Sequence, residues 1–413
     1  GPDPLPSVEP AHRRLARTVA ARSMVLLRNQ PVEGRPVLPV DGDALGCLAV
    51  FGRLGGAVNL GDAGSSDVYA LDGVTPLAGL REAVGEARVV DGTGLDAEAA
   101  GAAAADADVA VVVVGYTYED EGEYIGDPGV DLSGLFPKTD DPELVARWQE
   151  EIASLPPLTV PDHVTPRPAA VTYTSGGDRS SLRLRPADVD LVRAVAAANP
   201  RTVVVLEGGS AILSAEWDST VPALLHSWYA GGDAGGALAD VLFGAAEPGG
   251  RLPLSIPADE AHLPEFDAEA DAVVYDRWHG WWHLERSGHR PAYPFGFGLG
   301  YTTFSIEEAA ARRDGPDLVV DGTLANTGPR GGSDVVQVYA RFADPEAPRR
   351  LAGFARLEVP SGGRRPFEVR VPPVRLARRD PVGHGWTPPT GEVELEVARH
   401  VGDPSARRLT VVL

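Results

Sequence analysis

The feature that most constrains this chain is a series of short, fully apolar runs, each followed closely by glycine. The runs cover residues 48–51, 109–114, 202–206 and 223–228. Between and around them, helix-like stretches lie near residues 77–86, 97–106, 186–198 and 234–243. Fully apolar strands that alternate with helices are typical of a largely parallel sheet sandwiched by helices. The pattern predicts an α/β fold whose ligand loops lie at the carboxyl ends of the strands.

The pattern changes at about residue 305, where helical periodicity stops. Short runs with alternating apolar residues follow, at 318–324, 335–342, 354–359, 367–371, 393–397 and 409–413. Turn-forming clusters such as Asn326–Pro329 and Pro360–Gly363 separate them. Several short strands at this spacing indicate an all-β sandwich of roughly a hundred residues.

We therefore expect four segments along the chain. They are a linker at 1–10, an α/β domain at 11–260, a connecting segment at 261–304 and a β-sandwich at 305–413. The α/β domain should open with an amphipathic helix, because Leu15, Ala16, Val19, Ala20 and Leu26 recur at helical spacing. A proline-rich insertion at about 124–175 interrupts the alternation. It either covers a pocket or decorates the surface.

Composition excludes several classes of protein. The chain has 37 Lys and Arg against 59 Asp and Glu, a net charge of −22, which is a poor match for nucleic acid. With 43% hydrophobic and 23% charged residues it is globular, and Cys47 is its only cysteine. No apolar run approaches the ~18 residues of a membrane span. The start of the chain has no basic-then-apolar export signal, which slightly favours the cytoplasm.

The strongest candidate for chemistry is an acidic segment that follows the second strand. Glu119, Asp120, Glu121 and Glu123 lie within five positions, where an open α/β sheet presents a ligand loop. Partial burial of such a cluster raises the pKa of at least one acid, as a general acid requires. The alternative is a solvated acidic loop in an acidic protein. The candidate substrate-binding rings around this segment are Tyr116, Tyr118 and Tyr124.

Other patterns give weaker signals. The glycine-rich stretches at 52–56 and 61–66 lack the spacing that cradles phosphate. His279 and His283 have the spacing of a helical metal pair but no obvious third ligand, so we expect no metal and no cofactor. The last of these patterns is a group of three tryptophans, which either stacks on sugar rings or forms an interdomain core: Trp278, Trp281 and Trp282.

Several longer motifs resemble the C-terminal half of glycoside hydrolase family 3, the β-glucosidase and β-xylosidase family. The most specific is Ser227–Gly244, continued by Pro248–Pro253, which is similar to the family's Trp-Tyr-Pro-Gly stretch and Arg-Leu-Pro turn. Pro294–Phe304 resembles the segment that leads into the family's fibronectin type III-like domain. The remaining matches are Ser23–Asn29 at the start, and Asn326–Gly328 and Val335–Tyr339 in the final domain.

This resemblance implies an enzyme that hydrolyses terminal β-linked sugars with retention of configuration. In the family a barrel domain carries an aspartate nucleophile, and a loop of the α/β domain supplies a glutamate acid/base. The segment Glu119-Asp120-Glu121-Gly122 fits the first part of that loop, so the resemblance implies that Glu121 is the acid/base, with Glu119 and Glu123 as alternatives. Asp178-Arg179 fits the second part, some fifty-five residues later.

The family's barrel has no counterpart in these 413 residues. The resemblance therefore implies two partners: a β-linked glycoside substrate, and a barrel domain encoded upstream or on a separate chain. Alone, the chain should be inactive. Asp62 or Asp67 as a local substitute for the nucleophile is the weaker idea. The alternative function is a non-catalytic module, derived from the same family, that binds carbohydrate or protein.

Overall fold

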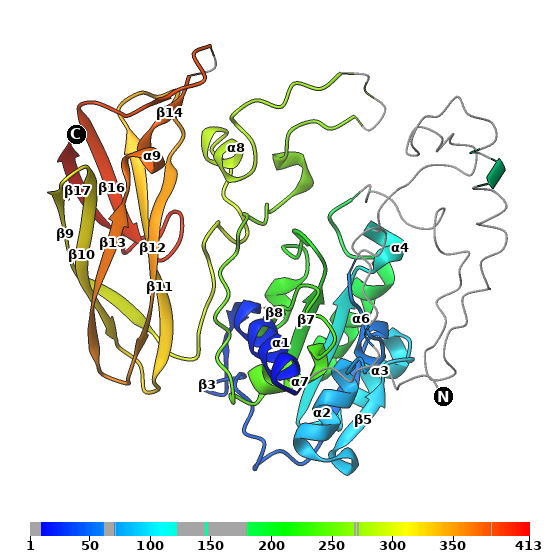
Figure 1. Ribbon diagram of the computed structural model, residues 1–413. Helices are drawn as coiled ribbons and strands as arrows, with labels where there is room; N and C mark the ends of the chain where they lie inside the picture. The colour runs from blue at the N-terminus through cyan, green and yellow to red at the C-terminus, as the bar shows by residue number, and fades with distance from the viewer. Residues whose placement is uncertain are drawn as a thin grey trace.

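The structure is a computed structural model of the 413-residue chain. It describes residues 10–61, 70, 72–121, 144, 146–147, 179, 181–267, 270, 272–380 and 382–413. The insertion expected at 124–175 lies outside these residues, apart from 144, 146 and 147. An α/β part and an all-β part lie side by side, as Figure 1 shows, and the connecting segment with the short helix α8 runs between them.

The α/β part is built on a six-stranded sheet with the strand order β1-β8-β7-β6-β4-β5. All neighbours in it are parallel except β1, which runs antiparallel to β8. The prediction of a largely parallel sheet is confirmed. The strands are β1 (Val25–Asn29), β4 (Leu48–Phe51), β5 (Val89–Gly92), β6 (Val109–Gly115), β7 (Thr202–Glu207) and β8 (Ala223–His226).

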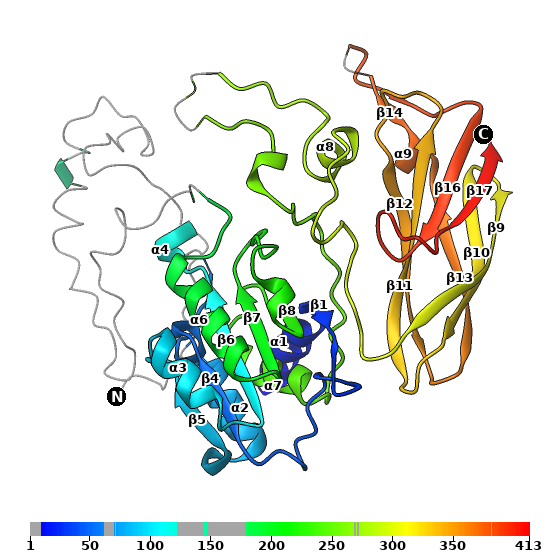
Figure 2. The ribbon, with the colours of Figure 1, turned by 180° about the vertical axis from the view of Figure 1, so that it is seen from behind.

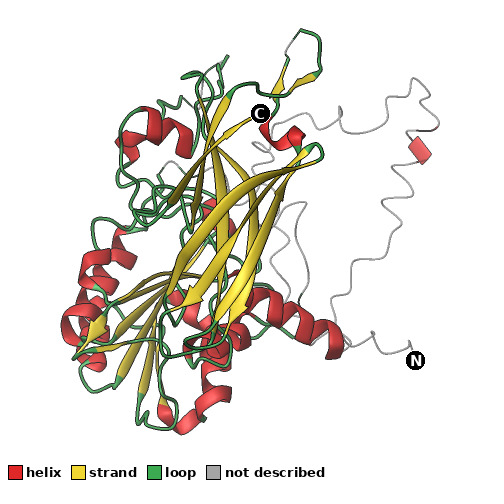
Figure 3. Ribbon diagram, turned by 90° about the vertical axis from the view of Figure 1, so that its left-hand side faces the viewer, coloured by secondary structure: helices red, strands yellow, loops and turns green. Residues whose placement is uncertain are grey.

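Helices cover both faces of the sheet, as Figures 2 and 3 show. Alternate residues of the central strands belong to the two separate cores beneath these helix layers. On β6, Val111 and Val113 join the core beneath one helix layer, and Val112 and Val114 join the core beneath the other. Both faces are covered, which explains why the strands read as unbroken apolar runs. The first layer is α1 (Pro10–Ser23), α2 (Pro76–Val84) and α7 (Ala234–Leu242), and the second is α3 (Ala97–Ala104) and α6 (Pro186–Ala198).

Helix α1 differs from its prediction in which face is buried. The helix packs on the α/β part through Ala20 and Ala21, while Leu15 and Val19 are 62% and 58% exposed. Arg17 Nε lies 2.6 Å from Asp240 Oδ2 of α7, which secures the helix from its charged side. Apolar spacing therefore predicted the helix correctly but not its packing face, and Leu26 lies beyond the helix in β1.

The all-β part is a sandwich of a three-stranded and a four-stranded antiparallel sheet, which confirms the predicted fold class. The first sheet has the order β13-β10-β9 and the second β12-β11-β16-β17. Their bounds are β9 (Phe304–Asp314), β10 (Asp317–Asn326), β11 (Gly332–Phe342), β12 (Arg350–Val359), β13 (Arg364–Val371), β16 (Glu392–Ala398) and β17 (Arg407–Val412). The short elements are α4 (Tyr118–Glu121), α8 (Trp281–Arg286), α9 (Pro373–Leu376), β2 (Pro31–Val32), β3 (Arg35–Pro36), β14 (Arg378–Arg379) and β15 (Trp386–Thr387).

The connecting segment packs against the sandwich through aromatic rings. The ring centroid of Trp281 lies 5.5 Å from that of Phe295 and 6.3 Å from that of Tyr339 on β11. The indole nitrogen of Trp282 donates to the carbonyl of Arg349, 2.5 Å away. Trp281 and Trp282 therefore pack between the connecting segment and the sandwich, as the expected interdomain role requires, whereas Trp278 lies against the guanidinium of Arg286, 4.3 Å from its ring centroid.

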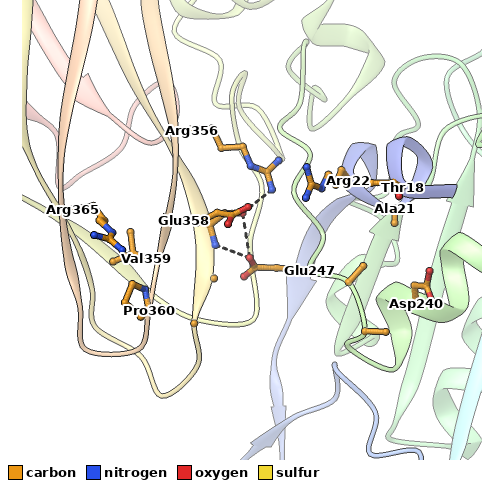
Figure 4. A pocket seen from close by; sticks show the side chains of 15 residues that line it. Thr18, Ala21, Arg22, Asp240, Glu247, Arg356, Glu358, Val359, Pro360 and Arg365 are labelled. Carbon is orange, nitrogen blue, oxygen red and sulfur yellow. Dashed lines mark hydrogen bonds between the residues drawn. The ribbon is translucent and has the colours of Figure 1, made fainter. Parts of the chain in front are cut away.

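A pocket of about 700 Å³ lies between α1 and the strands β11 and β12 of the sandwich. Figure 4 shows Arg22 of α1 and Arg356 of β12 approaching each other across it. Burial, together with the positive charges of Arg22 and Arg251, lowers the pKa of Arg356. Glu247 spans the junction, because its carboxylate accepts the backbone N–H of Ser333 at 2.7 Å. The pocket is therefore a polar junction between the two parts.

Candidate active site

The acidic segment lies at the carboxyl end of β6, the position that an open α/β sheet offers to ligands. Gly115 ends the strand with φ 142°, and a Cβ there would lie 1.9 Å from the carbonyl oxygen of Glu207 on β7. Only glycine allows the two strand ends to approach so closely. The chain then enters α4, where Asp120 Oδ2 accepts the N–H of Thr117 at 3.0 Å.

The carboxylate of Glu121 is held by groups from three other segments. Its Oε1 accepts the backbone N–H of Gly209 at 2.6 Å and the hydroxyl of Tyr229. Its Oε2 lies 3.0 Å from the Nε of Arg179. The side chain is 13% exposed. Charge-assisted hydrogen bonds on both oxygens fix the position of this carboxylate at the strand ends.

Arg179 is itself fixed by several contacts. Its guanidinium lies 4.1 Å from the ring centroid of Tyr116, and its Nη1 donates to the carbonyl of Ala211 at 3.3 Å. A second amino group, Nη2, donates to the hydroxyl of Ser210. The residue that resembles the second part of the family's acid/base loop thus contacts the residue that resembles the first, although an insertion separates them in sequence.

The tyrosine that contacts Glu121 follows a residue with unusual backbone geometry. Trp228 has φ 60°, which is rare for a bulky side chain and persists only where neighbours hold it. Its ring stacks on His226 with centroids 4.0 Å apart, and its indole nitrogen donates to the carbonyl of Ser23 at 3.0 Å. The backbone bend places Tyr229 against Glu121.

Gly209 completes the site by leaving room for the carboxylate. A Cβ there would lie 3.2 Å from Glu121 Oε1 and 3.3 Å from the ring of Tyr229. In the sequence, Gly209 stands out only as a glycine that follows the apolar run 202–206, and Tyr229 only as part of the motif Ser227–Gly244, so neither was predicted at the site. The signal that could have found them is their position, because both follow directly after neighbouring parallel strands.

The other acidic candidates have different surroundings. Glu119 is 57% exposed and lies 3.8 Å from Arg185. Asp120 accepts two hydrogen bonds from Arg185, at 2.8 and 2.6 Å, and also lies 3.6 Å from Arg53. Asp120 therefore secures α4 to its neighbours. Glu123, Asp62 and Asp67 lie outside the described residues.

The three candidate substrate-binding tyrosines also separate. Tyr116 is only 3% exposed, and its hydroxyl donates to the carbonyl of Arg183. This ring supports Arg179 from below, so its placement does not fit the expected sugar contact. Tyr118 is partly exposed on α4, and Tyr124 lies outside the described residues.

A buried glutamate beneath the site was not anticipated from the sequence. Glu207 ends β7, and its Oε2 accepts the amide N–H of Asn59 at 2.9 Å. Burial raises the pKa of Glu207 to about 7, against the smaller opposing effects of Asn59 and Arg53. Burial likewise lowers the pKa of His226 to about 4, which keeps that ring neutral. The sequence signal that could have revealed Glu207 is its position, because it is a single acidic residue at the end of the apolar run of β7.

Metal and membrane features are absent from the part of the chain that the structure describes. There, no group of three or more His, Cys, Asp and Glu side chains could hold a metal ion. Among the same residues, no helix has both the length and the apolar character needed to cross a bilayer.

The geometry first defines a class. A carboxylate is held at the strand ends of a helix-covered α/β sheet, and a β-sandwich follows, which is the architecture that the sequence resemblance to glycoside hydrolase family 3 implies. Residues 24–301 match the family model described as "Glycosyl hydrolase family 3 C-terminal domain", and residues 334–401 match a fibronectin type III-like domain. The chain belongs to glycosyl hydrolase family 3.

Curated relatives carry consistent names. A beta-glucosidase from Rhizobium radiobacter is 35% identical over 242 residues, 54% of this chain and 29% of the relative. A probable beta-glucosidase I from Aspergillus terreus is 29% identical over 295 residues, 67% of this chain and 34% of the relative. A xylan 1,4-beta-xylosidase from Xylanibacter ruminicola is 30% identical over 250 residues, 60% of this chain and 28% of the relative. The matched regions thus cover about a third of these relatives' length or less.

Solved structures show the same fold. A beta-glucosidase from Kluyveromyces marxianus superposes with a TM-score of 0.78 at 19% identity, over all of this chain and 63% of the other. A beta-glucosidase from Streptomyces venezuelae in complex with D-glucose gives 0.76 at 22% identity, over all of this chain and 61% of the other. The likeness extends over both the α/β part and the sandwich.

Proposed function

We propose that this chain is the part of a retaining β-glycosidase that supplies the acid/base residue, Glu121, and closes the sugar site. A barrel domain, on the same or a separate polypeptide, supplies the nucleophilic carboxylate. The observation that carries the proposal is the fixation of Glu121 by Gly209, Tyr229 and Arg179 at the carboxyl ends of the strands.

The chemistry requires two carboxyl groups with different tasks. In a retaining glycosidase they stand about 5 to 5.5 Å apart, one attacking the anomeric carbon and the other protonating the leaving oxygen. Asp120, the carboxylate next to Glu121 in sequence, is engaged by Arg185 and does not suit the attacking role. Glu121 in its neutral form gives its proton to the leaving oxygen, and as carboxylate it later takes a proton from water.

The proposed substrate class is a β-linked glucoside or a related β-linked sugar. It rests on the names of the curated relatives, which are beta-glucosidases and a beta-xylosidase. The barrel domain would form the other wall of the sugar site, so the identity of the sugar depends on both parts.

The decisive experiment measures hydrolysis of alkyl and aryl β-glucosides by the enzyme complete with its barrel. Glu121→Gln should lower kcat for an alkyl or nitrophenyl glucoside about 10²- to 10⁴-fold, the usual contribution of general acid/base catalysis. A dinitrophenyl glucoside, whose leaving group needs no proton, should lose less in the bond-breaking step. Glu119→Gln is the matched control, because that side chain is mostly exposed and should leave kcat almost unchanged.

Two results would contradict the proposal. One is full activity of Glu121→Gln on the alkyl glucoside, whose leaving group needs a proton. The other is a folded complex of chain and barrel that hydrolyses none of these glucosides, in which case a non-catalytic binding module is the better description.

A further inference from the structure

The pocket of about 700 Å³ between α1 and the sandwich collects positive charge from both parts of the molecule. Arg22 lines it from the last turn of α1, Arg356 from β12 and Arg365 from β13. In Figure 4 the guanidinium groups of Arg22 and Arg356 point toward each other across the junction. Like charges in this arrangement repel, so a negatively charged occupant between them is favoured. We call this space the junction pocket.

The arginines of the junction pocket lack partners of opposite charge. Within the described ranges, Arg22, Arg356 and Arg365 form no ion pair with a carboxylate. Burial lowers the pKa of Arg356, and the positive charge of Arg22 lowers it further. Nearby carboxylates oppose this effect more weakly. The pocket is therefore short of negative charge.

Most of the carboxylates that line the pocket are already engaged elsewhere. Asp240 Oδ2 lies 2.6 Å from the Nε of Arg17. Glu247 accepts the backbone N–H of Ser333 at 2.7 Å. Only Glu358, among the lining acids, has no hydrogen bond or ion pair in the part of the chain that the structure describes. Three guanidinium groups thus share the pocket with a single uncommitted carboxylate.

The guanidinium of Arg356 is held in place without being neutralised. Its Nη2 donates to the hydroxyl of Ser333 at 2.8 Å. Gly249 leaves room for the group, because a Cβ there would lie 2.7 Å from the Nη1 of Arg356. The planar fork of an arginine matches the oxygens of a phosphate group and binds them with two parallel hydrogen bonds. The position of Arg356 is therefore suited to a phosphate oxygen.

The rest of the lining suits a polar ligand that is larger than a bare ion. The volume lies within the range of about 300–1,000 Å³ that is usual for small-molecule sites. No aromatic side chain is found among the described lining residues. The lining offers instead the hydroxyl of Thr18, the carboxylate of Glu358 and the backbone of Gly331 and Gly332. Such groups are hydrogen-bond partners for the hydroxyl groups of a ligand.

We propose that the junction pocket binds a small phosphate ester that also carries hydroxyl groups, with the phosphate between Arg22 and Arg356. The ligand contacts α1 and β12 together and so ties the sandwich to the α/β part. This inference goes beyond the proposed function and does not rest on it, because the pocket shares no residue with the contacts of Glu121.

The test titrates the 413-residue chain with glucose 6-phosphate in an isothermal titration calorimeter. We expect saturable binding with a Kd of about 1 mM or tighter. Arg22→Gln and Arg356→Gln should each weaken the affinity about tenfold or more, because each removes charge-assisted hydrogen bonds to the phosphate. Arg375→Gln removes the same charge at an exposed position on α9, outside the pocket, and should leave the affinity unchanged.

Two ligand controls test the two halves of the proposed ligand. Glucose supplies the hydroxyl groups without the phosphate, and inorganic phosphate supplies the anion alone. Each should bind at least about tenfold more weakly than glucose 6-phosphate. If inorganic phosphate binds as tightly as the ester, or if sodium chloride at equal ionic strength abolishes the difference between the variants, the pocket takes simple ions only and the assignment is wrong.

Chemical protection locates the ligand independently of any substitution. Phenylglyoxal modifies accessible guanidinium groups, and mass spectrometry of the peptides reports the rate at each arginine. Glucose 6-phosphate should slow the modification of Arg22 and Arg356 several-fold and leave that of Arg375 unchanged. This readout uses the wild-type chain, so it decides the matter even if a glutamine variant fails to fold.

The outcomes that overturn the inference are clear-cut. One is the lack of saturable binding up to about 10 mM glucose 6-phosphate. Another is equal affinity in the wild type, Arg22→Gln and Arg356→Gln, and a third is modification of these arginines at the same rate with and without the ester. None of these measurements involves hydrolysis of a glucoside, so each result leaves the proposed role of Glu121 to its own test.

Discussion

The strand ends of the α/β sheet and the outer surface of the β-sandwich are both rich in charge, but water reaches them very differently. At the strand ends, Glu207 is 6% exposed, and Glu121 and Asp120 are 13% exposed at their side chains. On the sandwich, Arg312 and Arg370 are 51% and 46% exposed although each contacts several carboxylates. The same residue types therefore work under different dielectric conditions.

The difference shows where charge determines geometry. A buried carboxylate without partners is costly, so each one at the strand ends is matched to a donor or carries a shifted pKa. Exposed ion pairs are screened by water and lose side-chain entropy on pairing, so they stabilise little. The strand-end charges thus hold functional groups in place, whereas the charges on the sandwich mainly keep the surface hydrated.

The largest effect that we expect in this comparison is on stability, from Glu207→Gln. In the folded chain Glu207 keeps its proton up to about pH 7, against an ordinary value of 4.5. Between these values the folded state binds more protons than the unfolded state, so stability falls as pH rises. Because one pKa unit corresponds to about 1.4 kcal/mol, the glutamine variant should be more stable than the wild type by about 3 kcal/mol at pH 8.5.

Urea unfolding at pH 4.5 and pH 8.5 checks this expectation. The amide oxygen of the variant can still accept the N–H of Asn59, so the two proteins should differ little at pH 4.5. Glu392→Gln, at an exposed position on β16, is the control and should leave the pH dependence as it is. A wild-type protein whose stability does not decline between pH 5 and 8 would show that Glu207 is solvated or paired in solution.

The sequence was a good guide to the fold because the signals were local. A strand that is covered on both faces reads as an apolar run, so β4, β6 and β7 were predicted close to their observed bounds. Helix α6 was also predicted close to its bounds. Strands β1, β5 and β9 were missed, since β5 has only two apolar residues and β9 ends in a charged stretch. The exposed stripe of α1 could not be predicted, because spacing reveals an apolar face but not what covers it.

The candidate site was less predictable because it depends on distant contacts. The acidic segment was found from its composition and its place after a strand. The partners of Glu121 come from residues 179, 209 and 229, and no periodicity links these positions. Tyr116 was assigned to the substrate because it flanks the acids, yet its side chain is buried in the same core as Val112 and Val114 of β6.

A smaller effect should follow from Asp120→Ala. This change removes the acceptor of two hydrogen bonds from Arg185 and of one from the N–H of Thr117. We expect a loss of about 1 to 2 kcal/mol, less than for a fully buried pair because Arg185 is 39% exposed. Urea unfolding measures it, with Glu119→Ala as the neighbouring exposed control. An equal loss in both variants would mean that the partial burial of Asp120 has no energetic consequence.

The smallest effect should come from the sandwich surface, where Arg364 forms a bidentate pair with Glu307. Its nitrogens lie 2.8 and 3.0 Å from the two carboxylate oxygens, and the arginine side chain is 63% exposed. The pair lowers the pKa of Glu307, but water competes with both charges on all open sides. Arg364→Ala should therefore leave the thermal midpoint within the reproducibility of calorimetry at both low and high salt. A clear, salt-sensitive loss would show that surface pairs on this sheet are coupled as a network and that exposure alone does not separate the two regions.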